Sequence, residues 1–276
     1  MPPDWLAACR RAAAAVAQML AEATTTAERV EETGTRGHGG DDTLVIDAQA
    51  EALVFAELER LHRDAGARFS VVSEERGVVD FGGAGTVIVV DPIDGSLNAK
   101  RGLPHHALSI AVAEGPTMAD VAFGFVHDYG PGEEWHAFRG GGAYLDGQPL
   151  PSGVAERWSY GGEKLELLGI ESADPRWVRE AADDLAEAAH RVRALGTLAV
   201  TMCQVAAARM DAMVSIRNCR AVDVAASQLI VREAGGVVVF TAFEDPLGAP
   251  LDVEPHSPVI AARTTAGLDR LRRVPM

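Results

Sequence analysis

Between residues 69 and 138, short strand-like runs alternate with turns, and no other feature of the sequence constrains the fold as strongly. The runs are FSVVS (69–73), TVIVV (86–90), HALSIAVA (106–113), DVAFGFVH (120–127) and EEWHAF (133–138). They are rich in β-branched and aromatic residues, and turn-forming residues separate them. Turn signals at 140–142 and 146–147 bracket a further short strand around 143–145. The spacing predicts an antiparallel meander.

Helical periodicity surrounds these strands. Apolar residues recur every three or four positions over 5–30 and over 47–63, which predicts two amphipathic helices. The stretch GTRGHGGDD (34–42) between them is expected to be a linker or a mobile loop over a site, because four of its nine residues are glycine. Past a loop near 149–162, the second half reads as a strand, helices over 175–191 and 197–209, a strand over 212–216, a helix over 224–234 and a strand over 237–240. This mixture predicts an α/β (α+β) fold in layers.

Composition excludes several classes of protein. The 276 residues hold 25 Lys and Arg against 40 Asp and Glu, and the net charge of −15 argues against binding to nucleic acid. Lys100 and Lys164 are the only lysines, and neither lies in the Gly-Lys-Ser/Thr context of a nucleotide-binding Walker A loop. The three cysteines show no Cys-x-x-Cys spacing, and no apolar run approaches the roughly 20 residues of a membrane span. We expect a cytoplasmic protein without a membrane segment.

The segment VVDPIDGSLN carries the most informative carboxylates. A strand of buried character delivers Asp91 at its end, and a turn containing proline delivers Asp94 three residues later. Gly95 allows the backbone to approach a ligand closely, and a helical turn starting at Ser96 would direct N–H groups at an anion. Such a segment suits a metal and a phosphate together, although the two carboxylates could instead make only turn bonds to their own backbone.

Two other segments place carboxylates at comparable positions. Glu74 follows another strand in VVSEERG, and Asp223 stands at the start of a helix in AVDVAASQLIV. Taken singly, Asp223 and Asp47 fit helix N-caps. Glu74, Asp91, Asp94 and Asp223 together form a set of hard oxygen ligands with no lysine in any of the three segments, as Mg²⁺ prefers. Without a cation, clustered carboxylates would repel one another.

Three motifs carry a family resemblance. SEE (73–75), DPIDGS (91–96) and VDVAA-x-x-LI-x-x-EAGG (222–236) stand in the order and at the separations of the inositol monophosphatase superfamily, which the chain resembles over about residues 5–262. It is most similar to the archaeal-type fructose-1,6-bisphosphatase/inositol monophosphatases, through DDTLVIDAQAE (41–51), DPIDGSLNAKRGLP (91–104) and SIRN (215–218).

The resemblance implies a Mg²⁺-dependent phosphatase with a layered αβαβα fold, often a homodimer. Residues 1–276 would form a single phosphatase domain. Within it, residues 1–150 would carry the metal and nucleophile motifs, and residues 163–276 the substrate side and the last metal ligand. Roughly two or three Mg²⁺ ions would bind, and a metal-activated water would attack phosphorus in line.

The resemblance also implies roles for individual residues. Glu74 and Asp91, with the carbonyl of Ile93, match the ligands of a first Mg²⁺. Asp91, Asp94 and Asp223 match those of a second.

Two residues match the pair that orients the attacking water in this superfamily, namely Asp47 and Ser96. Ser96 takes the place of the more usual Thr and keeps the hydroxyl. The backbone N–H groups of Gly95 and Ser96 are expected to hold the phosphate oxygens as negative charge builds on them.

Departures from the superfamily bear on the substrate. Val222 replaces the usual Trp before the last Asp, and Ile216 stands where inositol-specific members carry a Glu that contacts a substrate hydroxyl. Arg217 beside it could pair with a second phosphate, or form only a surface salt bridge. We therefore expect a small phosphate ester, fructose-1,6-bisphosphate and/or inositol-1-phosphate, as the substrate. The alternatives are histidinol phosphate, NADP or adenosine bisphosphate, or a catalytically silent binding homologue.

Overall fold

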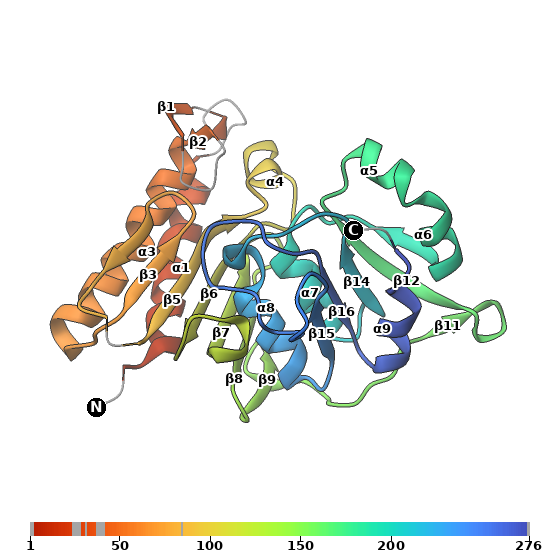
Figure 1. Cartoon of the computed structure of the whole chain (residues 1–276). Helices are drawn as coiled ribbons and strands as arrows, with labels where there is room; N and C mark the ends of the chain where they lie inside the picture. The colour runs from red at the N-terminus through yellow and green to blue at the C-terminus, as the bar shows by residue number, and fades with distance from the viewer. Residues whose placement is uncertain (1–2, 24–28, 31, 37–41, 84, 275–276) are drawn as a thin grey trace.

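The computed structural model describes residues 3–23, 29–30, 32–36, 42–83 and 85–274, which form alternating layers of helices and sheets (Figure 1). The outer helices beside the first sheet are α1 (Trp5–Glu22) and α3 (Val45–Ala65). The helices between the two sheets are α7 (Leu198–Ala206) and α8 (Ala221–Glu233). The outer helices beside the second sheet are α5 (Pro175–Glu180), α6 (Ala182–Ala188) and α9 (Thr265–Leu271). This order confirms the expected αβαβα arrangement.

The first sheet runs in the order β10-β9-β8-β7-β6-β5-β3-β4 across the described residues. Its strands are β3 (Ser70–Ser73), β4 (Gly77–Asp80), β5 (Val87–Asp94), β6 (Ala107–Ala113), β7 (Val121–Asp128), β8 (Glu133–Phe138), β9 (Gly142–Leu145) and β10 (Gln148–Pro149). From β5 to β10 each strand pairs antiparallel with the next, as a meander requires. The meander prediction is wrong for β5 and β3, which pair in parallel. The strand β4, which was not predicted, pairs antiparallel with the other edge of β3. The chain therefore passes from β4 across β3 before it forms β5.

The second sheet has the order β11-β12-β14-β16-β15, with β13 also paired to β12. Its strands are β11 (Trp158–Ser159), β12 (Lys164–Glu171), β13 (Ala189–Arg193), β14 (Ala212–Ser215), β15 (Val237–Phe240) and β16 (Val259–Ala262). The single helix predicted over 175–191 is therefore wrong, because residues 175–188 form α5 and α6 and the chain then enters β13. Pairing of β13 with β12 outweighs local helical periodicity there.

The N-terminal region differs from its sequence pattern. The helix predicted to reach residue 30 ends at Glu22, just before three β-branched threonines, which are weak helix formers. The expected loop 34–42 contributes instead to a hairpin of β1 (Glu32–Arg36) and β2 (Asp42–Leu44), and its residues 37–41 lie outside the described residues. Within the described ranges, no helix has the length and apolar character needed to cross a membrane.

Helix α8 fills the space between the two sheets. Every residue from Ala221 to Val231 is buried, and most of them are apolar. Gly124 in β7 allows this close packing, because a Cβ built there would lie 2.5 Å from the carbonyl oxygen of Ala226. One hydrophobic cluster, which includes Val89 and Val259, joins strands of both sheets to α7 and α8. On this ground we propose that the two halves form a single domain.

Gly124→Ala is expected to destabilise this packing. The added methyl group would meet a backbone oxygen that cannot rotate away, so α8 and β7 must separate. We expect urea denaturation to show a loss of about 1–3 kcal/mol in the free energy of unfolding, the usual cost of overpacking a core. Ala122→Val on the same strand is the control, because Ala122 borders a cavity of about 370 Å³. Equal losses in both variants would contradict the close contact as the cause.

Candidate functional site

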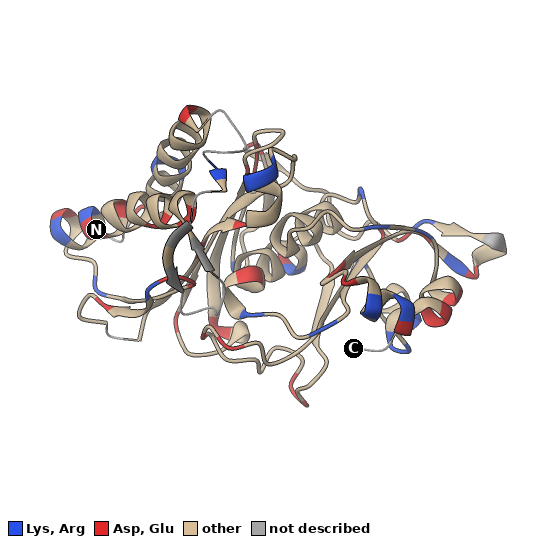
Figure 2. Cartoon of the chain, turned by 90° about the horizontal axis from the view of Figure 1, so that it is seen from above, with Lys and Arg blue, Asp and Glu red and all other residues tan. Residues whose placement is uncertain are grey.

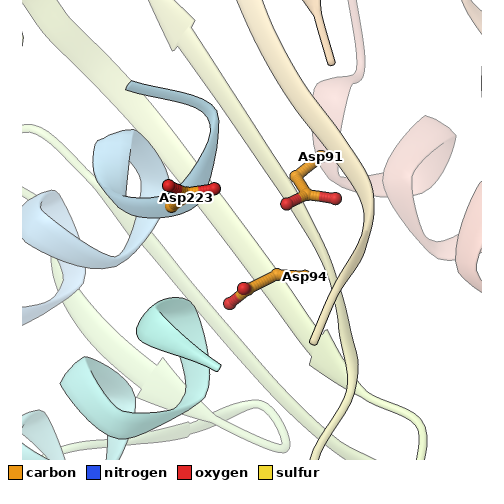
Figure 3. Close-up of side chains that lie close together, drawn as sticks. All are labelled: Asp91, Asp94 and Asp223. Atoms are coloured by element: carbon orange, nitrogen blue, oxygen red, sulfur yellow. The ribbon is translucent and has the colours of Figure 1, made fainter. Parts of the chain in front are cut away.

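Three carboxylates converge where β5 ends and α8 begins. One oxygen from each of Asp91, Asp94 and Asp223 lies within 4.8 Å of the others, and all three residues are buried. Figure 3 shows Asp91 and Asp94 projecting from one strand and Asp223 from the neighbouring helix. Residues three apart on a regular strand point to opposite faces. The pairing of β5 with β6 shifts register between Asp91 and Asp94, and this irregularity lets both carboxylates join one cluster.

Backbone and hydroxyl groups hold two of these carboxylates in place. Oδ2 of Asp94 accepts hydrogen bonds from the Thr197 hydroxyl and from the N–H of Ala199, the latter at 2.7 Å. Asp91 does make a turn bond, since its Oδ1 accepts from the N–H of Ile93 at 2.9 Å. A carboxylate has lone pairs for further partners, so this bond is compatible with metal ligation.

Glu74 meets the cluster through an arginine. It lies in the turn between β3 and β4, with Oε1 2.5 Å from Nη1 of Arg220. The same guanidinium places Nη2 3.0 Å from Oδ1 of Asp223. Arg220 is also the N-cap of α8, and Oδ2 of Asp223 accepts its backbone N–H at 3.0 Å. The N-cap prediction for Asp223 is therefore wrong, because this carboxylate sits in the first turn as the second half of a capping box.

Asp47 and Ser96 adjoin the cluster from α3 and α4 (Ser96–Arg101). The N-cap prediction for Asp47 is also wrong, since Leu44 is the N-cap of α3 and Asp47 lies in its first turn. Oδ1 of Asp47 is buried and has no hydrogen-bond partner in the described part of the chain. The Ser96 hydroxyl donates to the Ile93 carbonyl at 3.0 Å and also lies within hydrogen-bonding reach of Asp47. An unpaired buried acceptor is costly, so Oδ1 is suited to receive a polar ligand.

Gly95 links the carboxylates to α4. Its φ of 92° is a left-handed conformation that residues with a Cβ rarely adopt. A Cβ there would also lie 3.1 Å from the carbonyl oxygens of Gly196 and His105. The helical turn expected from Ser96 is present, and Figure 2 shows basic residues on this short helix, whose last turn carries Lys100 and Arg101.

Burial and repulsion between like charges raise the pKa values of Asp94, Glu74 and Asp91. Burial, with the charge of Asp223, raises the pKa of Asp94 to about 8. Burial also raises the pKa of Glu74 to about 7 although Arg220 opposes the change, and burial with the charge of Glu74 raises the pKa of Asp91 well above its usual range. A bound cation favours the ionised form of such groups. Oxygen donors held together in this way, next to the unpaired oxygen of Asp47, fit a hard divalent metal.

A cavity of about 600 Å³ opens beside the cluster, large enough for a small molecule. It is lined by Asp94, Leu97, Asn98, Glu171, Ser172, Ala173, Asp174, Trp177, Ala194, Leu195, Gly196, Thr197, Leu198, Arg220 and Asp223. The first half of the chain supplies the strand end and α4, whereas the second half supplies most of the wall. The site therefore forms only when both halves are packed together.

The sequence profile of the inositol monophosphatase family matches residues 3–273. A fructose-1,6-bisphosphatase/inositol-1-monophosphatase of Methanothermobacter thermautotrophicus is 36% identical over 213 residues, which cover 73% of this chain and 72% of that protein. The chain belongs to the inositol monophosphatase family. An inositol-1-monophosphatase of Mesorhizobium japonicum is 33% identical over 207 residues, which cover 72% of each chain. A solved inositol monophosphatase-fructose 1,6 bisphosphatase aligns with a TM-score of 0.77 at 25% identity, over 97% of this chain and 98% of that one.

These relationships confirm the family, the fold and the phosphatase class expected from the motifs. Sequence patterns alone do not identify every residue that shapes this inositol monophosphatase site. Glu51, one turn along α3 from Asp47, accepts hydrogen bonds from the Ser73 hydroxyl and from Nε of Arg76 at 3.0 Å. These two partners stand on either side of Glu74, so Glu51 holds the turn that presents it.

Arg220 is the other omission, because the sequence pattern shows a ligand set without lysine and leaves the arginine before Asp223 unexamined. The available signal is Arg-x-x-Asp across a helix start, which matches the spacing of a capping box. The observed ion pairs show that an arginine, as well as a bound metal, can supply a positive charge to these carboxylates.

Arg217 is not among the described residues that line the cavity. Its Nη2 lies 2.7 Å from Oε2 of Glu180, and its guanidinium carbon lies 5.0 Å from the ring centroid of Trp177. Trp177 does line the cavity, so Arg217 packs behind its wall. The surface ion pair considered from the sequence is thus present, and any contact of Arg217 with a substrate requires that pair to break.

Glu171 at the end of β12 anchors the loop that precedes α7. Its Oε1 accepts from the N–H of Leu195 at 2.9 Å and from the Thr201 hydroxyl at 2.6 Å. Burial raises the pKa of Glu171 from 4.5 to about 7, although these hydrogen bonds oppose the change. Between these two pH values the folded state holds a proton that the unfolded chain has released.

This proton linkage predicts a pH dependence that Glu171→Gln should reduce. Because the pKa of Glu171 is raised in the folded state, its protonated form contributes fully to the free energy of unfolding below about pH 4.5. That contribution is lost as the pH rises through 7. Glutamine cannot ionise and keeps Oε1 as an acceptor, so above pH 7 we expect the variant to be more stable than wild type by up to about 3 kcal/mol.

Urea denaturation between about pH 5 and pH 8 in EDTA measures this difference. Glu166→Gln, an exposed position on the same strand, is the control. If the free energy of unfolding changed with pH as steeply in Glu171→Gln as in wild type, the proton linkage would be contradicted.

Proposed function

We propose that this chain is a phosphatase of small sugar and polyol phosphomonoesters that depends on Mg²⁺. The buried cluster of Asp91, Asp94 and Asp223 beside a cavity of about 600 Å³ carries the proposal. Oxygen-only donors favour Mg²⁺ over softer metals, and roughly two or three ions are proposed from the family resemblance. When bound, the metal supplies an activated water and neutralises charge on the phosphate and the leaving oxygen.

The proposed metal ligands divide between two elements and a turn. Asp91 and Asp94 come from β5, Asp223 comes from α8, and Glu74 comes from the β3–β4 turn. The carbonyl of Ile93 completes the set, because its oxygen has a second lone pair beside the one that accepts from the Ser96 hydroxyl.

Asp47 and Ser96 are proposed to orient the attacking water. The buried Oδ1 of Asp47 can accept a hydrogen bond from that water. Burial, with the charges of Glu74 and Glu75, raises the pKa of Asp47 to about 7, which suits a group that accepts a proton near neutral pH. The Ser96 hydroxyl lies between this carboxylate and the Ile93 carbonyl, and it has one proton to donate. Turning it toward Asp47 would leave both lone pairs of the Ile93 carbonyl free.

Phosphate binding is proposed for the backbone N–H groups of Gly95 and Ser96. The left-handed φ of Gly95 and the tight space around it bring main chain close to the carboxylate cluster. Main-chain donors held in place in this way can stabilise charge that develops on phosphate oxygens.

Fructose-1,6-bisphosphate and inositol-1-phosphate are the proposed substrates. The relatives described above are named for these two activities. We therefore favour these two substrates over histidinol phosphate, NADP and adenosine bisphosphate. All proposed catalytic carboxylates are present, which favours an enzyme over a silent binding homologue. Release of inorganic phosphate from both substrates, with Mg²⁺ and with EDTA, tests the proposal directly.

A homodimer in the cytoplasm remains our proposed setting for this enzyme. The dimer is proposed from the family resemblance, and sedimentation of the purified chain tests it. The location is proposed from Cys9, Cys203 and Cys219, which are all buried free thiols.

Asp94→Asn is expected to abolish phosphatase activity without unfolding the protein. The residue is 7% exposed, but asparagine has nearly the same shape as aspartate and removes a charge that burial disfavours. We expect turnover at saturating Mg²⁺ to fall at least about 100-fold, with an unchanged circular dichroism spectrum. Asp64→Asn, at an exposed position in α3, is the control. Turnover near that of wild type would exclude Asp94 as an essential ligand.

Arg217→Ala tests the proposed contact with a second phosphate. If the Glu180 pair opens toward the substrate, kcat/KM for fructose-1,6-bisphosphate should fall by roughly 2 kcal/mol more than that for inositol-1-phosphate. Arg176→Ala is the control, since Arg176 pairs with Asp174 at the cavity. Equal losses of kcat/KM for both substrates, or no loss, would exclude a contact of Arg217 with a second phosphate.

A further inference from the structure

Arg220 binds two carboxylates that we propose as metal ligands. Nη1 lies 2.5 Å from Oε1 of Glu74, Nη2 lies 3.0 Å from Oδ1 of Asp223, and Nε lies 3.4 Å from Oδ2 of Asp223. The arginine side chain is 20% exposed, so much of the pairing is sheltered from water. Although burial by itself lowers it, the charges of Asp223 and Glu74 raise the pKa of the Arg220 guanidinium, which therefore stays protonated.

This guanidinium and a divalent metal would compete for the same oxygens. Both oxygens of Asp223 already receive N–H groups of Arg220, and Glu74 receives another. A metal on either carboxylate would bring a double positive charge close to the guanidinium, and the two cations would repel each other. The backbone N–H of Arg220 would still hold Oδ2 of Asp223 after its side chain had left. The metal ligand would therefore stay oriented by α8.

The cavity offers the displaced side chain a new anionic partner. Arg220 is the only Lys or Arg among the described residues that line it, whereas Asp94, Glu171, Asp174 and Asp223 are acids. A substrate phosphate in this cavity would provide oxygens that a planar guanidinium can bind with two N–H groups.

We propose that Arg220 is an exchangeable cation, which neutralises Glu74 and Asp223 until a divalent metal displaces it and which then binds the phosphate of the substrate. The proposal rests on the metal site proposed above. It assigns Arg220 two roles that can be measured separately, one toward the metal and one toward phosphate.

Calorimetric titration with Mg²⁺, without substrate, tests the competition. We expect Arg220→Gln to bind Mg²⁺ with a Kd at least about tenfold lower than that of wild type, because no guanidinium has to be displaced. Arg209→Gln is the matched control: Arg209 forms a comparable pair with Glu133, both contacts at 2.7 Å, away from the cavity lining. Equal or weaker metal binding in Arg220→Gln than in wild type would overturn the competition.

Titration with inorganic phosphate at saturating Mg²⁺ tests the second role. Arg220→Gln should bind phosphate at least about tenfold more weakly than wild type, while Arg209→Gln should not differ from it. Phosphate affinity unchanged in Arg220→Gln would overturn the transfer of Arg220 to the substrate.

Arg220→Lys keeps the proposal testable if the glutamine variant folds poorly. Lysine retains the charge but has no planar fork with which to join two carboxylates, so its Kd for Mg²⁺ should fall between those of wild type and Arg220→Gln. Thermal unfolding in EDTA establishes that each variant is folded. A wild-type protein that binds no Mg²⁺ would overturn the proposed function itself, whereas wild-type metal binding unaltered by either Arg220 variant would overturn only this inference.

Discussion

The buried carboxylates of the site repel one another, and the packing of the rest of the structure must overcome this repulsion. Asp91, Asp94 and Asp223 are each less than a tenth exposed, yet their oxygens come within 4.8 Å of one another. Burial and like charge both oppose ionisation of Asp91 and Asp94, and carboxylates that were free to move would separate. They are held together because their backbones belong to a central strand and to a helix buried between two sheets. The favourable packing of the fold thus offsets the unfavourable free energy of bringing the carboxylates together.

Contacts around the cluster offset part of this repulsion, and they come from all sides. Thr197 and Ala199 at the start of α7 donate to Asp94, while Arg220 supplies a positive charge to Glu74 and Asp223. On α3, Glu51 accepts hydrogen bonds from Ser73, just before Glu74, and from Arg76, two residues after it. Hydrogen bonds to charged groups are worth more than neutral ones, and each is strengthened by the shielded surroundings. The hydrogen bonds with α3 and α7 thus orient Glu74 and Asp94.

The electrostatics of the cavity also limit what it can bind. With acids predominating in its lining and a net charge of −15 on the chain, a phosphate ester would be repelled by the protein alone. Bound cations reverse the local sign, because an ion in direct contact outweighs more distant carboxylates. Metal and substrate binding should therefore be cooperative, and Arg220 is placed to contribute to both. A basic patch on the surface is not needed for an enzyme of this design.

The motifs SEE, DPIDGS and VDVAA were enough to identify the family and the layered fold, and they predict the carboxylates of the proposed site, because the chemistry of a carboxylate follows from its residue type. The sequence also predicted most strands of the first sheet, since each is a short run with strong β propensity. Local periodicity could not predict the parallel pairing of β3 with β5 or the strand β13, because both depend on tertiary contacts. The hydrogen-bonding partners of the carboxylates could not be predicted from the sequence either. Glu74 and Arg220 are 146 residues apart along the chain, and Asp94 and Thr197 are 103 apart. Only the packing of α7 and α8 between two sheets brings such residues together, because a side chain's charge is a property of its type whereas its neighbours are a property of the fold.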